Sequence, residues 1–477
     1  MGKKSKMQYF RIRMAGVLSA TRVGDAMTQP AYSVRQREKT RLNRAVFIPL
    51  CLVLCFYAAI HLIIRPNFGD DLTFARALDD SALLPWLKAR YYTWSSRLLP
   101  DAALVLVLRL PVLFWKAADV AMLLLLFHSL RLLLDQEMRL RDGTVLAMLL
   151  CCYPFSQMGS AGWITTTVIY LWPLALLAYS LSGMWRSIRG EALHWHRYLL
   201  FASAALFACG NELAAVLLLA ASVWGIVYAK KRGRQPVFAW VCLLIAAGGI
   251  AFAFFSPGNA GRMETEIGQW MPGFHQMSPV NKLHLGIVST FEHFTSLPSV
   301  ALFLLCFLTC AQVSAETSGL KKRMAGYVPL IIQIGFTVYF LLTRLLVKGG
   351  SGFAQQTSWP ENMGPAWFAA AAPAAFALMA AGLICSLVFL IGDRHRLCTI
   401  LLALAMGLAT RLSLSFSPTV IASGTRTYMF LYIILLAVAF VLWKRGLPKK
   451  AGYVFLASAG AGMIYNIAGV WLLQRNF

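Results

Sequence analysis

The chain has 477 residues, of which 59% are hydrophobic and only 13% are charged, and its mean hydropathy is +0.64. Soluble globular proteins carry about 25% charged residues, so this composition excludes a chain made of several soluble domains. The formal net charge of +25 is a second unusual feature. It is typical of proteins that bind nucleic acid and of proteins with basic segments beside a membrane.

The hydrophobic residues are concentrated in blocks close to the ~20 residues that a helix needs to cross a bilayer. Thirteen blocks are predicted to do so, at approximately residues 45–64, 112–134, 144–158, 163–182, 198–209, 212–229, 236–255, 298–315, 325–346, 366–391, 397–412, 425–443 and 451–473. Transmembrane β-barrel strands alternate apolar and polar residues in stretches of about ten, which excludes that class. The predicted fold class is all-α: a polytopic helical membrane protein with about 13 transmembrane helices.

The basic residues predict the orientation. If the N-terminus is cytoplasmic, most of the 44 Lys and Arg residues fall in cytoplasmic segments, as the rule for basic residues beside membrane helices requires. These segments are residues 1–44, 131–142, 186–197, 230–234, 321–323, 394–396 and 444–450. The positive charge is therefore an orientation signal, and we expect no binding to nucleic acid. With an odd number of spans, the C-terminus is predicted to be external.

Three regions follow from this topology. Residues 1–44 form a basic cytoplasmic tail, which precedes a retained anchor and either contacts anionic membrane lipids or is simply solvated. Residues 45–265 form a membrane core that carries the candidate site, and residues 266–477 supply the C-terminal helices and further outer loops. The ten cysteines lie almost wholly inside the predicted spans and are expected to be buried thiols.

The first outer loop carries an acidic pair, Asp70-Asp71, directly after Gly69. Adjacent carboxylates repel each other, so they favour a proton, a divalent cation or an arginine nearby. Alternatively, Asp70 caps a helix that runs through Leu72 to Leu78. If the pair is catalytic, we expect one acid to face the substrate and the other to cap a helix or meet an arginine, with Asp70 the preferred base and Asp71 the second candidate.

Aromatic and hydroxyl side chains follow at two outer helix ends. Trp94 and Arg97 close the first loop, where the aromatics either lie at the membrane interface or stack on a sugar, with Arg97 placed for a phosphate. Tyr170 and Trp172 precede Pro173, which leaves the carbonyl of Ile169 without its helical donor. Hydroxyls near such a break often only satisfy the backbone.

Asn211-Glu212 separates two apolar segments. Either one long helix carries a buried glutamate, or two short spans meet in a hairpin at the outer surface. An acid at membrane depth costs about 2.5–3.5 kcal/mol on insertion scales, so Glu212 is expected to have a partner or a function.

Further outer charges follow in the second half of the core and beyond it. Asn259 and Arg262 come after a Pro-Gly turn, where the chain leaves the membrane. Arg411, Arg426 and Lys348 lie near outer helix ends, and their default interpretation is that they extend to the interface.

Three outer-loop histidines recur nine residues apart, at His275, His284 and His293. They lack the close spacing that a metal site needs, so no metal site is predicted from them. Whether the protein needs a metal is left open, with the acidic pair as a possible cation site.

Taken together, these elements place carboxylates and arginines on one membrane face, a combination that suits a substrate with a hydroxyl to deprotonate and a phosphate to bind. The ordered series resembles the GT-C superfamily of integral-membrane glycosyltransferases, and more specifically an uncharacterised bacterial family of predicted glucosyltransferases. The resemblance covers about residues 45–265. It is carried by Asp70-Asp71, Trp94…Arg97, Tyr170-Leu171-Trp172-Pro173, Asn211-Glu212 and Pro257-Gly258-Asn259…Arg262. One departure is Ser96, which stands where the family pattern has glycine.

The resemblance implies a bacterial cytoplasmic (inner) membrane enzyme whose site faces the periplasm or exterior. It implies transfer of a sugar from a polyprenyl-phosphate-linked donor to a cell-surface glycan or lipid-linked acceptor. Asp70 or Asp71 would be the base, and Arg97, Arg262 and Arg426 would be candidates for the phosphate. Glu212 and Asn259 would position the acceptor or the sugar. The remaining substrate-binding candidates are Trp94, Tyr170, Trp172 and Asn211.

Two other functions are kept as alternatives. A transporter or flippase for lipid-linked sugars would carry charges at several membrane depths. Here most predicted spans contain no charged residue. Lys116 and Asp119 are the exception; they lie three residues apart on one predicted helix, where they are able to pair. A glycan polymerase or ligase usually has a large arginine-rich outer loop, whereas residues 256–297 hold only Arg262 and Lys282 as Lys or Arg.

Overall fold

The computed structural model describes residues 45–475, except for residues 67, 136, 192, 297–298, 318 and 347–365. The predicted basic tail (1–44), and Lys348 with the rest of the outer segment 348–365, lie outside the described residues. The described part of the chain forms helices and turns and has no strand. The predicted all-α, polytopic helical fold is therefore confirmed.

Eleven helical segments in the described part are long and apolar enough to cross a membrane. They are Ala45–Ile63, Val112–Leu134 (α5), Leu140–Ala161 (α6, Leu140–Cys151, with η1, Phe155–Ala161), Trp163–Ile188 (α7, Trp163–Thr166, with η2, Thr167–Leu171, and α8, Trp172–Ile188), Glu212–Lys230 (α10), Val237–Phe254 (α11), Leu320–Thr343 (within α15, Leu320–Leu346), Trp367–Leu390 (within α16, Ala366–Leu390), Arg394–Phe416 (α17, Arg394–Leu412, with η5, Ser413–Phe416), Thr425–Trp443 (η6, Thr425–Tyr428, with α18, Met429–Trp443) and Lys449–Arg475 (α19).

Two of the thirteen predicted spans are corrected. The block 198–209 corresponds to α9 (Trp195–Ala208), whose 14 residues reach about 21 Å, less than the ~30 Å of a hydrocarbon core. The block 298–315 corresponds to α14 (Val300–Glu316), which is bent by 83° from the preceding α13 (Pro279–Ser296). Counted as one span, this bent pair raises the total to 12 in the described residues.

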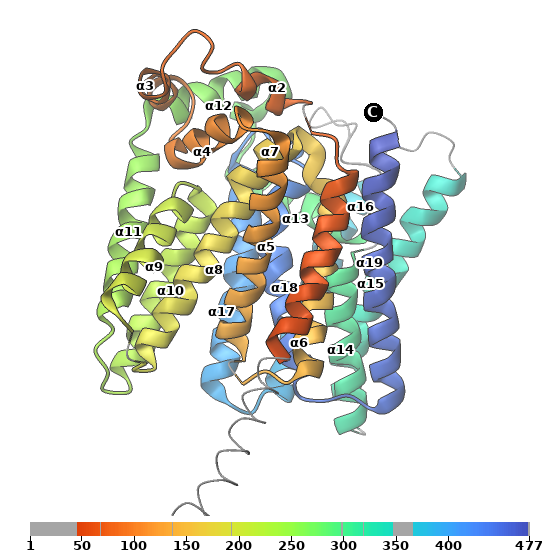
Figure 1. Ribbon diagram of the computed structural model, residues 1–477. Coiled ribbons are helices and arrows are strands. Elements are labelled where there is room, and N and C mark those ends of the chain that lie inside the picture. The colour runs from red at the N-terminus through yellow and green to blue at the C-terminus, as the bar shows by residue number, and fades with distance from the viewer. Residues whose placement is uncertain are drawn as a thin grey trace, which may run out of the picture.

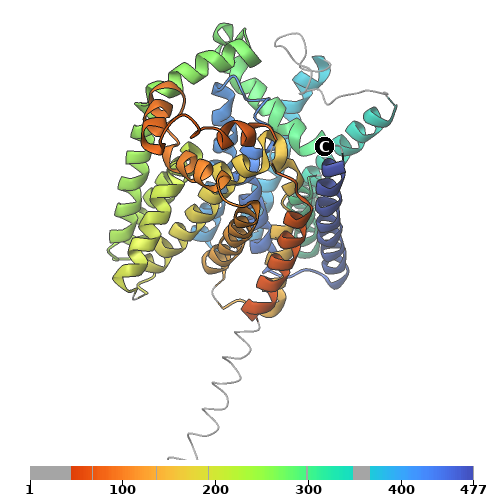
Figure 2. The same cartoon turned by 45° about the horizontal axis from the view of Figure 1, so that its top comes forward.

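Four further helices form a layer at one end of the bundle, which we call the outer cap. They are α2 (Asp70–Ala75), α3 (Leu83–Thr93), α4 (Leu98–Leu108) and α12 (Pro257–Trp270). Figure 1 shows the outer cap above the membrane helices, at the same end as the C-terminus of α19, whereas the helix that begins at Ala45 starts at the opposite end. In Figure 2 the outer cap is turned toward the viewer, and α3 lies close to α12, with which it packs.

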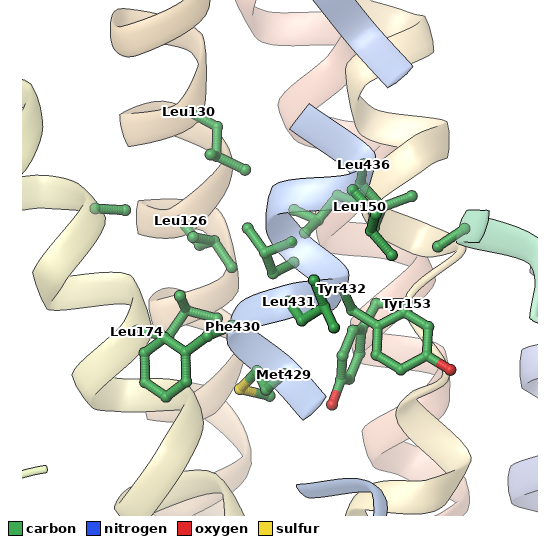
Figure 3. Packing of buried hydrophobic residues seen from close by; sticks show 14 of the residues in the cluster. Leu126, Leu130, Leu150, Tyr153, Leu174, Met429, Phe430, Leu431, Tyr432 and Leu436 are labelled. Atoms are coloured by element: carbon green, nitrogen blue, oxygen red, sulfur yellow. The ribbon is translucent and has the colours of Figure 1, made fainter. Parts of the chain in front are cut away.

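Helix α18 is the centre of the bundle. All but two of its residues are buried, as expected for a helix that is hydrophobic around its whole circumference. Figure 3 shows its side chains between Leu126 and Leu174 on one side and Leu150 and Tyr153 on the other. Because η6 leads directly into α18, this rigid core fixes the position of Arg426 at the outer end of the bundle.

Candidate functional site

The acidic pair divides into two different environments. Asp71 is completely buried, and its Oδ1 accepts hydrogen bonds from the Thr165 amide at 2.8 Å and the Thr165 hydroxyl at 2.7 Å. Its Oδ2 accepts from the Ile164 amide at 3.3 Å. These amides belong to the first turn of the segment Trp163–Ile188, whose free N–H groups need such acceptors. Asp71 is therefore the cap of a membrane helix that lies far away in sequence.

Two glycines allow this contact. Gly162 has φ 110°, and a Cβ atom there would lie 2.5 Å from Asp71 Oδ1. Gly69 has φ 59°, and a Cβ atom there would lie 3.1 Å from the carbonyl of Ala161. Both positions combine a backbone conformation that favours glycine with a close approach. The first outer loop thus packs backbone to backbone on the start of α7.

Asp70 is exposed. It is the first residue of α2, where no side-chain cap hydrogen bond forms, so the alternative that Asp70 caps this helix is wrong. Among the described residues, its carboxylate has no hydrogen-bond or ion-pair partner. The sequence predicts one acid that faces the substrate and another that caps a helix or meets an arginine. The capping role falls to Asp71, and Asp70 remains the candidate to face the substrate.

The pair has limited capacity for a divalent cation. Three donors already occupy the oxygens of Asp71, which leaves Asp70 as the available carboxylate. No group of three or more His, Cys, Asp or Glu side chains suited to a metal ion occurs in the described ranges. The three outer histidines bind different partners, since His275 contacts Glu264, His284 contacts the Ala369 carbonyl and His293 contacts Tyr432.

Glu212 is paired with Arg97. The Arg97 Nε donates to both carboxylate oxygens, at 2.8 and 3.1 Å, and the two side chains are 19% and 30% exposed. Burial disfavours the charge on Arg97, but the carboxylate of Glu212 outweighs it and raises the pKa of Arg97 above its usual value. Arg97 therefore stays charged and directed at Glu212 in this structure.

Ser96 connects this ion pair to α12. Its hydroxyl lies 3.5 Å from Glu212 Oε1 and accepts from Asn259 Nδ2 at 3.1 Å. A glycine at position 96 would allow a close backbone approach. Such an approach occurs at Gly258, where a Cβ atom would lie 2.4 Å from the amide nitrogen of Trp94. The first turn of α12 is thus held against the end of α3.

The polar face of α12 has unused hydrogen-bonding capacity. Asn259 Nδ2 also donates to the Ala253 carbonyl at 2.8 Å, while its Oδ1 is buried with no partner among the described residues. Arg262 lies 3.8 Å from Glu266, and its Nε is likewise buried without a hydrogen-bond partner. These two atoms are available to a ligand.

A second cation in the outer cap was missed in the sequence. The Arg90 guanidinium lies 5.9 Å from the ring centre of Trp94 and forms an ion pair with Asp101 at 3.2 Å. Burial lowers the pKa of Arg90 and raises the pKa of Asp101, and each charge partly offsets the effect on the other. Asp101 stands in the otherwise apolar helix α4, and this was the signal that could have revealed the pair.

Tyr170 and Trp172 point to different places. The ring of Tyr170 lies 5.8 Å from the guanidinium of Arg97, so Tyr170 belongs to the outer site. The indole of Trp172 instead donates to Asp119 Oδ1 at 2.9 Å, and Asp119 Oδ2 contacts His61 Nε2 at 2.8 Å. Trp172 is thus part of a buried polar network within the membrane helices.

The predicted pairing of Lys116 with Asp119 is wrong. The Lys116 ammonium donates to the Ile64 carbonyl at 3.0 Å, at the end of the first spanning helix. A helical spacing of three residues allows two side chains to meet, but here each one finds a better partner on a neighbouring helix.

Asn211 has a structural role at the break between α9 and α10. Its Oδ1 accepts from the amides of Leu213 at 3.1 Å and Ala214 at 3.2 Å, which caps α10. Its Nδ2 donates to the Ile169 carbonyl, the group left free by Pro173, at 3.1 Å. Of the two possibilities left open, two helices meeting at residues 209–211 is the one that the structure has.

Arg426 reaches the site from the C-terminal half. Thr425 donates to Gln157, and a Cβ atom at Gly424 would lie 3.5 Å from Ser160 Oγ, so η6 packs on η1. Ser160 adjoins Ala161, on which Gly69 packs, so Asp70 and Arg426 follow two loops that meet the same short turn.

Arg426 lies close enough to Tyr170 for its charge to act on the tyrosine hydroxyl. Its Nε is buried without a partner, and it forms no ion pair within the described residues.

Arg411 does not extend to the interface, so that expectation is corrected. It is 1% exposed, and its Nη2 donates to Ser289 Oγ and the Val420 carbonyl, both at 3.0 Å. Its guanidinium lies 4.4 Å from the ring of Tyr428. Arg411 therefore holds α13 and the loop before η6 together.

The charges of the site are thus mostly paired. Arg90 with Asp101, Arg97 with Glu212 and, more loosely, Arg262 with Glu266 balance one another, while Asp70 and Arg426 do not have such partners in the described ranges. Comparisons with protein families, with curated proteins and with solved structures found no match to this chain.

Proposed function

We propose that this protein transfers a sugar from a polyprenyl-phosphate-linked donor to a cell-surface glycan or lipid-linked acceptor. The observation that carries the proposal is the division of the acidic pair: Asp71 caps a helix, whereas Asp70 is exposed and unpartnered in the described part of the chain. Such a transfer needs a base for the acceptor hydroxyl and a cation for the departing phosphate. Asp70 and Arg426 are the two unpaired groups that fit these roles.

Asp70 acts as the general base in this proposal. An acceptor hydroxyl is a weak nucleophile at neutral pH, and a positioned carboxylate accelerates its attack by about 10²–10⁴-fold. The acceptor O–H bond breaks as the oxygen attacks the anomeric carbon, and the proton moves to Asp70. The bond from that carbon to the phosphate oxygen breaks at the same time.

The departing polyprenyl phosphate gains negative charge, which Arg426 stabilises. Arg262 Nε, which has no hydrogen-bond partner among the described residues, donates to the phosphate, while Asn259 Oδ1 accepts from a hydroxyl of the sugar or the acceptor. Arg97 is directed at Glu212, so we assign this pair to positioning Tyr170 and the outer cap rather than to direct phosphate binding. Asn211, Trp94 and Trp172 support the site through their contacts with the backbone, Arg90 and Asp119.

In the same proposal the protein resides in a bacterial cytoplasmic (inner) membrane, and the outer cap faces the periplasm or exterior. The many candidate spans make it a multi-pass membrane protein. The orientation rests on the basic segments of the sequence, which would then lie on the cytoplasmic side.

One observation favours a transporter or flippase as a second candidate. His61 and Asp119 are buried among the membrane helices, and His61 Nδ1 lies 2.7 Å from the Tyr57 carbonyl. That carbonyl only accepts, so Nδ1 carries a hydrogen, and the contact with Asp119 shares a second proton. Ionisable groups at membrane depth are common in proton-coupled carriers.

The test uses the protein in sealed lipid vesicles with a polyprenyl-phosphate donor carrying a radiolabelled hexose, and cell-envelope glycan as acceptor. Transfer is measured as label that leaves the organic phase. Asp70→Asn should lower the rate by at least ~10²-fold. Asp80→Asn, which removes an exposed acid from the same loop, should leave it unchanged. Full transfer by Asp70→Asn would refute the base, and label that only crosses the bilayer unreacted would favour the carrier.

A further inference from the structure

A cavity of about 350 Å³ lies within the membrane helices of the C-terminal half, apart from the outer site. It lies between α14, α15 and α19. Its lining is mostly apolar. Helix α15 contributes Gln333, Ile334, Thr337 and Val338 to it. All of its lining residues are uncharged, so a charged headgroup would find no compensating ion there.

Gln333 faces this cavity in a fixed orientation. It is 2% exposed, and its Nε2 donates to the Phe294 carbonyl at 2.7 Å. A carbonyl only accepts, so this bond determines which end of the amide is the nitrogen. Phe294 stands four residues before Pro298, which has no N–H to give to that carbonyl. The amide end of Gln333 is therefore required at this position.

The other end of Gln333 is left without a partner. Its Oε1 is buried and accepts no hydrogen bond from any described residue. An amide oxygen has two lone pairs and no hydrogen, so only a donor can satisfy it. A buried acceptor without a donor is costly, and in hydrocarbon no bulk water replaces the missing bond.

Thr337 lies one helical turn further along α15 and lines the same cavity. Threonine hydroxyls in these helices usually bond the carbonyl three or four residues back, as Thr343 does with Tyr339 at 2.8 Å. The Thr337 hydroxyl forms no such bond and is buried without a partner in the described part of the chain. Gln333 and Thr337 thus each bring a buried polar atom without a partner to one uncharged cavity, which Ser299, whose hydroxyl is likewise buried without a partner in the described part of the chain, also lines.

The wall of the cavity is open on the lipid side. Ile334 is 44% exposed and Val338 is 46% exposed, and both belong to a helix that crosses the membrane. A molecule that enters from this side comes from the bilayer, and its remaining surface must be apolar.

We infer that this cavity binds a neutral lipid with a free hydroxyl group, whose O–H donates to Gln333 Oε1 and accepts from the Thr337 hydroxyl. A phosphate headgroup is excluded by the uncharged lining and by the need for a donor. The inference does not depend on the proposed sugar transfer, because no residue of the outer site lines the cavity.

The experiment measures binding of tritiated 1,2-dioleoylglycerol to the protein in nanodiscs by scintillation proximity. The matched ligand is the same lipid acetylated on its hydroxyl, which has no donor. Wild-type protein should bind dioleoylglycerol at least about 5-fold more tightly than the acetylated lipid, the size expected for one hydrogen bond. Equal binding of the two lipids would show that the hydroxyl is not recognised, and binding of neither would show that the cavity takes no such lipid; either result would overturn the inference.

Two variants locate the binding. Thr337→Val keeps the shape of the side chain and removes only its hydroxyl, so the affinity for dioleoylglycerol should fall about 5-fold. Thr343→Val on the same helix removes a hydroxyl that is already bonded to Tyr339 and should change it little. Unchanged affinity in Thr337→Val would place the lipid elsewhere. Asp70→Asn should bind the lipid as wild type does, which separates this site from the proposed transfer.

Discussion

The side-chain amide of Asn211 donates to the main-chain carbonyl of Ile169 at 3.1 Å, and this carbonyl is the one that Pro173 leaves without its helical donor. Gln333 does the same for Phe294, four residues before Pro298. In both halves of the protein an amide from another helix satisfies a carbonyl that a proline has freed. Each of these two carbonyls is therefore satisfied by one specific side chain from another helix.

Asn211→Leu removes this bond and the cap of α10 together. We expect the free energy of unfolding to fall by about 2–4 kcal/mol, as for the combined loss of a cap and a buried hydrogen bond. Thermal unfolding in detergent measures the change. Asn281→Leu alters an exposed asparagine on α13 and is the control. Equal stability of the two variants would show that the Ile169 carbonyl finds another donor.

Gly162→Ala should displace Asp71 from the start of α7, because the new Cβ atom would lie 2.5 Å from the carboxylate. Gly190→Ala is a close control, since Gly190 also has a positive φ, 81°, but has nothing within 4 Å. Both variants carry a conformational cost of roughly 1 kcal/mol, and only Gly162→Ala should lose a further ~1–2 kcal/mol from the cap. The comparison of their melting temperatures isolates the contact. Equal melting temperatures would contradict the capping role.

Arg97 and Glu212 should show a measurable coupling. Either single alanine variant leaves one charge of a largely buried pair without its partner, whereas the double variant removes both. We expect a coupling free energy of about 1–2 kcal/mol in a double-mutant cycle of unfolding. Additive effects would mean that the contact between Arg97 and Glu212 does not stabilise the folded protein. Arg97→Lys should behave like the alanine variant, because the Nε that contacts both oxygens is lost.

The orientation is testable with single cysteines in a background without the native ones. Cysteine at Asp80, in the outer cap region, should react with an impermeant thiol reagent added outside intact cells. Cysteine at Arg232, between α10 and α11, should react only after permeabilisation. The reverse pattern would place the acidic pair in the cytoplasm and exclude a periplasmic site. Asn476 is a further labelling position, although it lies outside the described residues.

Chelation with EDTA should leave sugar transfer unchanged. A cation shared by Asp70 and Asp71 would need to compete with the three donors already bonded to Asp71. Transfer that stops with EDTA and returns with Mg²⁺ would show that a cation binds there despite these bonds.

Hydropathy predicted most of the membrane helices because the apolar residues of each span are consecutive in the sequence. The two failures are α9, which is too short, and the pair α13–α14, which is bent by 83°; a hydropathy window measures neither the length nor the bend of a helix. Glu212 could be singled out for the same local reason, since it is an acid beside an apolar segment.

The roles within the site depended on distant partners. Asp70 and Asp71 are neighbours with the same side chain, and only the approach of Ile164 and Thr165 distinguishes them. Tyr170 and Trp172 were grouped by their positions in sequence. Residues two apart in a helix point to different faces, so the regular helical period already predicts their separation. What the sequence does not show is the partner of each, Arg97 for Tyr170 and Asp119 for Trp172.

The pairing of prolines with distant amides also constrains the order in which the protein matures during synthesis. When the segment that carries Pro173 leaves the ribosome, Asn211 has not yet been made, so the Ile169 carbonyl enters the membrane without its final donor. Phe294 must likewise wait for α15 to bring Gln333. In each half, the hydrogen bond to the freed carbonyl therefore forms only after a later helix has been inserted. Truncated chains that end before Asn211 or before Gln333 should be the natural substrates of membrane quality-control proteases.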